Sequence, residues 1–306
     1  MVLDRYLLRM AAPRVAAVLA LGVLVATGAD VAEQGARVTA DAGGWALAAS
    51  FYALRVPLVA VEILPLACLV GAAWTLAALR ARGELDALRT AGAGLARLAR
   101  PFALLGAIAA AGVSVTSEIV VPRAERRASS IARSIVGLPA PERADAAIAG
   151  DVVTFGDGTA FRLRRGMIPE RLAERRTPPR LPLLRPEAAP RAELAAAITA
   201  LGRAGHETAY ERTILVARPA LAGACLLAPL VGLLVGFRLA RFALPAALAA
   251  SVAWAALCVF FAALGGAGAI PPVAAAWAPH ALVLLISLGA QAMGRPCRRK
   301  TMKSVT

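Results

Sequence analysis

Six long apolar stretches constrain the fold of this chain more than any other feature of its sequence. A helix needs about 20 mostly apolar residues to cross the roughly 30 Å hydrocarbon core of a bilayer. The stretches that meet this requirement run over residues 11–29, 54–79, 102–121, 214–237, 243–264 and 273–293. The chain is 59% hydrophobic, which exceeds the level of about one half that is usual for soluble domains. We therefore predict a mainly α-helical protein, built as a six-helix transmembrane bundle.

The first stretch has a second interpretation. Basic residues within the first 14 positions precede a short apolar core that ends near Gly28 and Ala29, and this is the pattern of a cleaved signal peptide. Asp4 interrupts the basic region, and five further spans follow. Both observations favour a retained transmembrane helix.

Arginine is unevenly distributed along the chain, whose net charge is +15. Basic residues are concentrated before residue 15, over 80–100, over 238–241 and after residue 294. Lys and Arg in short loops mark the cytoplasmic side of a membrane protein. We therefore expect an inner-membrane protein with both termini in the cytoplasm. Because the basic residues flank apolar runs and no basic recognition motif is present, we predict no nucleic-acid partner.

The order of these segments predicts three regions. Residues 1–122 hold the first three spans and a cytoplasmic loop over 80–100, and residues 213–306 hold the last three spans and a basic tail. Residues 123–212 lie between them and are expected on the periplasmic side. Long translocated segments are exempt from the charge rule, so the basic character of this region does not oppose that placement.

The periplasmic segment shows four local patterns. Residues 123–136 are expected to continue the third span as a helix. Alternating apolar residues around a Gly-Asp-Gly turn predict a β-hairpin over 151–165. The Pro-rich stretch 177–190 is typical of an extended linker, and residues 193–203 have the periodicity of an amphipathic helix. We therefore predict a small insertion that contains β-structure.

Motifs for nucleotide, acyl-transfer or metal chemistry are absent from the sequence. It has no Gly-rich phosphate loop ending in Lys-Ser or Lys-Thr, no G-x-S-x-G, no H-E-x-x-H and no C-x-x-C pair. Three of the four cysteines lie inside apolar stretches, where Cys acts as a small hydrophobe. We therefore predict no catalytic residue, no metal site and no cofactor. The energy for any transport is expected to come from an ion gradient or from a separate ATP-hydrolysing chain.

Glu62 is the one acid well inside an apolar stretch. A charge at the bilayer centre costs about 2.5–3.5 kcal/mol on insertion scales, so the side chain should face the bundle interior or be protonated. Two interpretations remain open: a polar lining of a substrate path, or a hydrated carboxylate near the outer interface that pairs with Arg55. Pro57 and Pro65 flank Glu62 and are expected to bend or locally open the helix.

The outer end of the third stretch carries a small polar face. Ser114, Ser117 and Glu118 share this face by their i, i+3, i+4 spacing. Hydrogen bonding between helices is the simpler explanation for it. Pro122 is expected to end the span.

Gly232 and Gly236 form a G-x-x-x-G motif in the fourth stretch. Such spacing lets two helices approach closely. As a signal for a dimer it is weak, because matches arise by chance in a chain so rich in Ala and Gly.

The loop over residues 80–100 is the most informative polar segment. Glu84 and Asp86 lie in the first turn of a short predicted helix, where the helix dipole favours acids, and Gly92 and Gly94 end it. One interpretation is a helix that docks onto a soluble partner. The other is an ordinary connection between two spans that carries cytoplasmic arginines.

Six short segments occur in the order and spacing of one known family. They are Leu3 to Tyr6 (Leu-Asp-Arg-Tyr), Pro57 to Leu66, Gly83 to Gly92 with its Gly-Glu-Leu start, Glu118 to Pro122, Leu194 to Gly205, and Ala269 to Pro272. With the six-span topology, they make the chain similar to the YjgP/YjgQ permeases, LptF and LptG, of lipopolysaccharide export. The first residues of the chain and the start of its last span resemble LptG more closely than LptF. The resemblance covers roughly residues 1–125 and 190–295.

The resemblance implies a transport subunit and not an enzyme. In this family two permeases pair around a cavity open to the outer leaflet. A cytoplasmic dimer of the ATPase LptB closes the cavity and moves lipopolysaccharide towards a periplasmic bridge. The expected partners are therefore an LptB-like ATPase dimer, an LptF-like second permease, lipopolysaccharide and a periplasmic bridge protein.

The resemblance also implies where energy enters the subunit. The coupling element that meets the ATPase would be the short helix of the 80–100 loop, with Glu84, Leu85, Leu88, Arg89 and Gly92 as its residues. In this interpretation Glu84 supplies a charge-assisted contact and the leucines an apolar anchor.

A path for the lipid is assigned from position and not from a matched motif. It comprises Arg37, Arg55, Glu62 and Glu118; the arginines at the outer mouth suit lipid phosphates. The family's periplasmic domain is a longer β-jellyroll, so the shorter segment here predicts a reduced jellyroll-like insertion. Two other functions fit the residues: a membrane scaffold or regulator that does not transport, and an ion-coupled carrier that uses Glu62.

Overall fold

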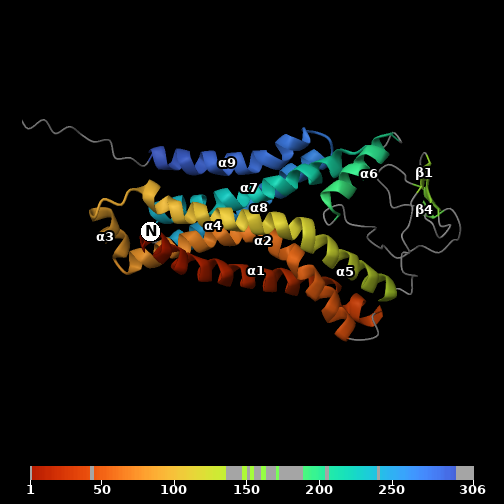
Figure 1. Ribbon diagram of the computed structural model, residues 1–306, viewed down its shortest axis with the longest axis horizontal. Helices are drawn as coiled ribbons and strands as arrows, with labels where there is room; N and C mark the ends of the chain where they lie inside the picture. Colours follow the sequence, from red (N-terminus) through yellow and green to blue (C-terminus); the bar gives the residue numbers. More distant parts are fainter. Residues whose placement is uncertain are drawn as a thin grey trace, which may run out of the picture.

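Long helices lying side by side form an elongated bundle in the computed structural model (Figure 1). The structure describes residues 2–41, 45–135, 147–149, 152–154, 160–162, 170–171, 189–203, 207–239 and 242–293. The amino end of the chain and the short helix α3 lie at one end of the bundle, whereas helix α6 and the strands lie towards the other (Figure 1).

Six helices are long and apolar enough to cross a membrane, counting only the part of the chain that the structure describes. They are α1 (Val2–Asp41), α2 (Trp45–Ala81), α4 (Leu95–Val115), α7 (Ala209–Arg238), α8 (Ala243–Gly266) and α9 (Pro272–Met293). Each predicted apolar stretch falls on one of them, so the prediction of a mainly helical chain with six candidate spans is confirmed. Most helices extend beyond the apolar stretch, because a charged residue ends a hydrophobic run without ending a helix.

Helix α4 continues without interruption into the segment that follows it. A π-helical turn, η1 (Thr116–Val120), connects α4 to α5 (Val121–Ile135). The predicted helical continuation after residue 122 is confirmed, and the end of the membrane span at Pro122 stays a prediction. Proline lacks an N–H and clashes with the carbonyl group four residues earlier in a regular α-helix. Here the Val121 N–H donates to the Thr116 carbonyl oxygen, an i to i−5 bond that widens the turn just before the proline.

Helices α2 and α7 form the most extensive helix pair of the bundle. A Cβ atom built on Gly232 of α7 would lie 2.1 Å from the carbonyl oxygen of Leu69 on α2, and one on Gly236 would lie 3.0 Å from the Cβ atom of Leu76. The two backbones can therefore approach this closely only with glycine at these sites. The G-x-x-x-G motif packs two helices of the same chain.

The two prolines beside Glu62 do not interrupt their helix. Pro57 and Pro65 both lie inside α2, which is continuous from Trp45 to Ala81. Pro65 is buried in the bundle. The residues that follow it on α2, Ala67, Cys68 and Leu69, form part of the main apolar core. Helix α2, which packs against α7 and α1, is therefore not opened at either proline, and the expected bend stays a prediction.

Four short strands fall within the segment between α5 and α6. They are β1 (Ala147–Ala149), β2 (Val152–Thr154), β3 (Ala160–Arg162) and β4 (Glu170–Arg171), paired antiparallel in the order β1-β2-β3-β4. Strands β2 and β3 pair with Val153 opposite Phe161, within the predicted hairpin, whose turn lies outside the described residues. Strands of two or three residues do not establish the predicted β-insertion, and its jellyroll-like character stays a prediction. The predicted linker lies outside the described residues except for its last two positions.

Helix α6 (Arg191–Arg203) returns the chain to the bundle. Leu194 and Ile198 are buried on one side of it, and most of its other described side chains are exposed. The predicted amphipathic helix is therefore confirmed, and it contacts α7.

Candidate functional site

The first candidate site is the short helix α3 (Glu84–Thr90), which connects α2 to α4. Gly83 before it has φ +74° and Gly92 after it has φ +80°, a left-handed conformation that glycine adopts without strain. These two residues turn the chain sharply at both ends of α3. The predicted short helix and its glycine boundary are therefore present.

The leucines of α3 point into the bundle. Leu85 has no exposed surface and belongs to an apolar cluster with Leu7 of α1 and Leu98 of α4. Leu88 is half-buried against the same cluster. Burying a leucine side chain contributes about 1.5–3 kcal/mol. Leu85 and Leu88 therefore seat α3 on the spans, and the apolar anchor expected for a partner is directed inward instead.

Two contacts between side chains connect α3 to other helices. The Tyr6 hydroxyl of α1 donates a hydrogen bond to Glu84 Oε2 at 2.6 Å. The Arg89 guanidinium lies over the Phe237 ring of α7, 3.9 Å from its centroid, a cation–π contact. The first turn of α3 is therefore connected to α1 and its last turn to α7, at the end of the bundle where the chain begins (Figure 1).

The second candidate site is a partly open cavity of about 250 Å³ between the helices. Helices α2, α5, α7, α8 and α9 and the π-turn η1 surround it, and most of its lining is aliphatic. Its polar lining residues are Glu62, Ser117, Thr213, Arg218 and His280. Glu62, for which the sequence left two interpretations open, lines this cavity together with a basic residue.

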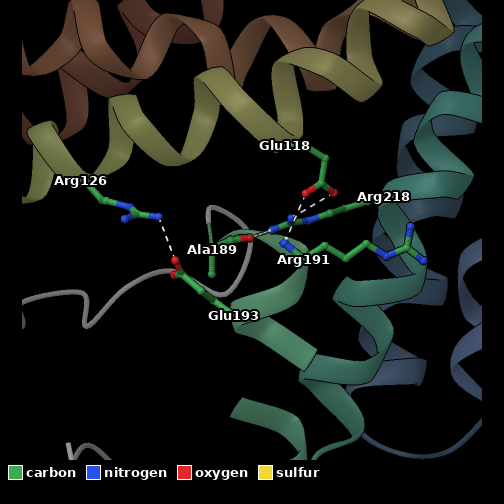
Figure 2. A network of polar contacts seen from close by, with 6 residues as sticks. All are labelled: Glu118, Arg126, Ala189, Arg191, Glu193 and Arg218. Carbon is green, nitrogen blue, oxygen red and sulfur yellow. Dashed lines mark hydrogen bonds and ion pairs between the residues drawn. The ribbon is translucent and has the colours of Figure 1, made fainter. Parts of the chain in front are cut away.

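Arg218 is the site residue that sequence reasoning missed. Its side chain is only 10% exposed, on α7, within the predicted fourth span. Arg218 Nη1 lies 3.7 Å from Glu118 Oε1, and the guanidinium donates a hydrogen bond to the Ala189 carbonyl oxygen (Figure 2). A buried charge is stabilised by such partners. The available signal was a lone arginine in an apolar stretch, which is expensive and commonly functional.

Glu118 connects two parts of the structure that are distant in sequence. Besides its ion pair with Arg218, it accepts a hydrogen bond from the backbone N–H of Arg191 at 3.3 Å (Figure 2). A second pair joins Arg126 of α5 to Glu193 of α6 at 2.9 Å. Both side chains of that pair are more than half exposed, so it contributes little by itself. Together these contacts fasten the start of α6 to η1, α5 and α7 beside the cavity.

The serines next to Glu118 bond within their own helix. Ser114 Oγ donates to the Ala110 carbonyl oxygen and Ser117 Oγ to that of Ser114. Of the three residues on this polar face, Glu118 therefore bonds to another helix, as expected. These two hydrogen bonds of Ser114 and Ser117 stay within their own helix.

Arg55, another residue assigned to the lipid path, does not line the cavity. Arg55 of α2 forms an ion pair with Asp30 of α1, and its guanidinium lies 5.8 Å from the ring centroid of Phe51. The sequence suggested Glu62 as a partner for Arg55, whereas the structure pairs Arg55 with Asp30. Arg37 belongs to α1, but its side chain lies outside what the structure describes.

His280 closes another part of the cavity wall. It is buried, and its Nδ1 accepts a hydrogen bond from the Trp254 indole nitrogen at 2.9 Å. Among the described residues, no group of three or more His, Cys, Asp or Glu side chains could hold a metal ion. The cavity is thus an apolar chamber with a few polar groups in its wall.

In the described part of the chain, six helices that are long and apolar enough to cross a membrane define a multi-pass membrane protein. Residues 5–143 and 167–290 match the family model described as lipopolysaccharide export system permease LptF/LptG. The chain belongs to this family of inner-membrane permeases. No curated protein matches it. Because one model covers both LptF and LptG, the closer likeness to LptG stays a prediction.

Proposed function

We propose that this permease is the transmembrane subunit of an ABC transporter that extracts lipopolysaccharide, or a related lipid, from the inner membrane for export. Family membership supports the transport role. In this proposal an LptB-like ATPase dimer hydrolyses ATP, and an LptF-like permease completes the membrane part. A periplasmic bridge protein receives the lipid.

The observation that carries the proposal is the seating of α3. Its leucines hold it against α1 and α4, while Glu84, 35% exposed, remains accessible at its first turn. A partner that pushed on such a helix would act directly on the spans, since Leu85 is fixed in their apolar core. A cationic group of the ATPase could bind Glu84 through a charge-assisted hydrogen bond.

The orientation in this proposal places α3 and both chain ends in the cytoplasm. The amino end of α1 contacts α3 directly through Tyr6, and α6 and the strands lie towards the opposite end (Figure 1). The arginines around α3 agree with the excess of basic residues in cytoplasmic loops. The strands and α6 then belong to the periplasmic insertion.

The lipid path in this proposal includes Arg37, Arg55, Glu62 and Glu118. The structure adds Arg218, which contacts Glu118 and lines the cavity together with Glu62. The shared cavity also favours a second candidate function, an ion-coupled carrier in which Glu62 binds the ion. Loss of transport in Glu62→Gln with normal ATPase binding would support that second function.

The test of the proposal is a charge reversal at α3. The chain is co-expressed with the LptB-like ATPase and second permease of its own genome, and the complex is purified through the permease. Glu84→Arg should reduce recovery of the ATPase at least about tenfold, since it removes a charged contact and adds a repulsive one. Glu193→Arg is the matched control, because it makes the same charge change on α6 at the other end of the bundle.

Lipopolysaccharide should stimulate ATP hydrolysis by the wild-type and Glu193→Arg complexes but not by the Glu84→Arg complex. If the Glu84→Arg chain recovers as much ATPase as wild type and keeps the stimulation, α3 is not the coupling element. If the wild-type chain binds no ATPase at all, a scaffold or carrier function replaces the transporter.

A further inference from the structure

The first turns of α1 and the helix α3 enclose a cleft at the end of the bundle. The cleft has a volume of about 310 Å³ and is lined by Leu3, Tyr6, Glu84, Ala87 and Leu88. It contains one carboxylate, one phenol and otherwise aliphatic surface. The amino end of α1 thus forms one wall of the surface that presents Glu84.

The contact between Tyr6 and Glu84 has the geometry of a strong hydrogen bond. The Tyr6 hydroxyl oxygen lies 2.6 Å from Glu84 Oε2, within the range of about 2.5–2.7 Å for a hydroxyl that donates to a carboxylate. The other carboxylate oxygen, Oε1, lies 3.8 Å from Arg82 Nη1. One oxygen of Glu84 is therefore held by α1, and the second faces a more distant arginine.

This hydrogen bond is not needed to hold α3 in place. Tyr6 is 40% exposed, whereas its neighbour Leu7 is fully buried in the same apolar cluster as Leu85. The leucines already seat the helix, and a hydrogen bond at an exposed site adds little to folding stability. The hydroxyl of Tyr6 instead limits the rotamers of the Glu84 side chain, whose free rotation would have to be lost when a partner binds.

We propose that Tyr6 is a positioning residue, which orients the Glu84 carboxylate for the partner ATPase and connects α3 directly to α1. The inference rests on the proposed function, because it requires an ATPase that binds α3. A partner then meets a preorganised carboxylate, which lowers the entropic cost of association. Its push on α3 also reaches α1 through Tyr6 and Leu7, without passing through α2.

The expected consequence for α1 follows from its packing. Helix α1 contacts α2 and α4, but most of its apolar surface faces outward, including Leu21, Leu24 and Val25. Helix α1 packs closely against α2 but contacts fewer helices than α2 or α7 do, so it can tilt at less cost than these two. Movement of α3 would therefore displace α1 more readily than these two helices.

The test is a double-mutant cycle in the full complex with its LptB-like ATPase and second permease. Tyr6→Phe removes only the hydroxyl, and Glu84→Ala removes the carboxylate it bonds. We expect Tyr6→Phe to weaken ATPase affinity about two- to tenfold, the range for an ordinary intramolecular hydrogen bond, because the site is partly exposed. In the Glu84→Ala background, the same change should have no further effect.

Tyr52→Phe is the matched control, because the Tyr52 hydroxyl is buried at the other end of α2 and has no hydrogen-bond partner in the described part of the chain. It should bind the ATPase like wild type. Thermal unfolding of Tyr6→Phe should match wild type within about 1 °C, as expected for a positioning role at an exposed site.

The outcomes separate the inference from the function on which it rests. If Tyr6→Phe binds the ATPase normally while Glu84→Ala does not, the positioning role is refuted and the transporter stands. If Tyr6→Phe weakens binding equally with and without Glu84, Tyr6 acts independently and the inference also fails. If Glu84→Ala itself binds normally, the coupling role of α3 is refuted, and the inference with it.

Discussion

Replacing Gly232 by alanine should separate the two most extensively packed helices of this permease. The added methyl group would lie 2.1 Å from the Leu69 carbonyl oxygen and 2.9 Å from its carbon. Ordinary van der Waals contact begins at 3.4 Å, so the methyl group lies more than 1 Å too close. The obstructing atoms belong to the backbone of α2, which cannot rotate away as a side chain would.

The magnitude follows from two opposing effects. Forcing an extra methyl group into a packed core costs about 1–3 kcal/mol, and here we expect about 2–3 kcal/mol because backbone atoms obstruct it. Alanine gains about 1 kcal/mol over glycine in helix propensity. The cost of the clash should exceed the gain in helix propensity, because the backbone of α2 lies directly against Gly232 of α7. We expect the free energy of unfolding to fall by about 1–2 kcal/mol, which corresponds to a Tm lower by roughly 2–8 °C.

The assay is thermal unfolding of the purified chain in detergent, followed by circular dichroism at a helix wavelength. Gly112→Ala on α4 is the control, because a Cβ atom there would have no atom within 4 Å. That variant keeps the propensity gain without the clash, so its Tm should equal or exceed that of wild type. A Gly232→Ala chain that melts at the same temperature as Gly112→Ala would refute the close-packing argument.

Two further predictions concern the cavity wall. Glu118→Gln removes the charge that faces Arg218, so helix α6 should detach from the bundle more often. The backbone amides of α6 should then exchange with deuterium about fivefold faster. Unchanged exchange would show that other contacts hold α6. Trp254→Phe leaves the buried Nδ1 of His280 without its indole donor and should lower the free energy of unfolding by about 1–3 kcal/mol in denaturant titration. An unchanged denaturation midpoint would mean that this hydrogen bond makes no net contribution to the free energy of unfolding.

The spans were predictable because the bilayer imposes one length and one composition on every crossing segment. Their ends were less predictable. Asp30 and Glu33 end the first apolar run, yet α1 continues to Asp41. Charges stop a segment from being apolar but do not stop a helix from forming, since a helix ends where its backbone hydrogen bonds end.

The orientation of the α3 leucines could not be predicted from spacing. Leu85 and Leu88 lie on one face of a helix, and periodicity identifies that face without saying what covers it. Leu7 of α1 and Leu98 of α4, from two other segments, form the surface on which Leu85 packs. A leucine expected to meet another protein is therefore already buried within its own chain.

Arg218 shows a different limit of sequence reasoning. Averaged over a whole span, one arginine is outweighed by its apolar neighbours, so the span is still recognised and the charge is overlooked. Its partner Glu118 lies 100 positions earlier in the other half of the chain, and no local spacing connects the two. Only the fold places the two side chains beside one cavity.

The close approach of α2 and α7 has a consequence for how the protein is made. Translation releases the first three spans well before Gly232 and Gly236 exist, and until then the surface of α2 around Leu69 has no partner from this chain. The three early helices must therefore remain in the membrane, incompletely assembled, until the later spans are synthesised. We expect a fragment that stops after α5 to be short-lived in cells, because membrane quality control degrades spans that cannot complete their packing.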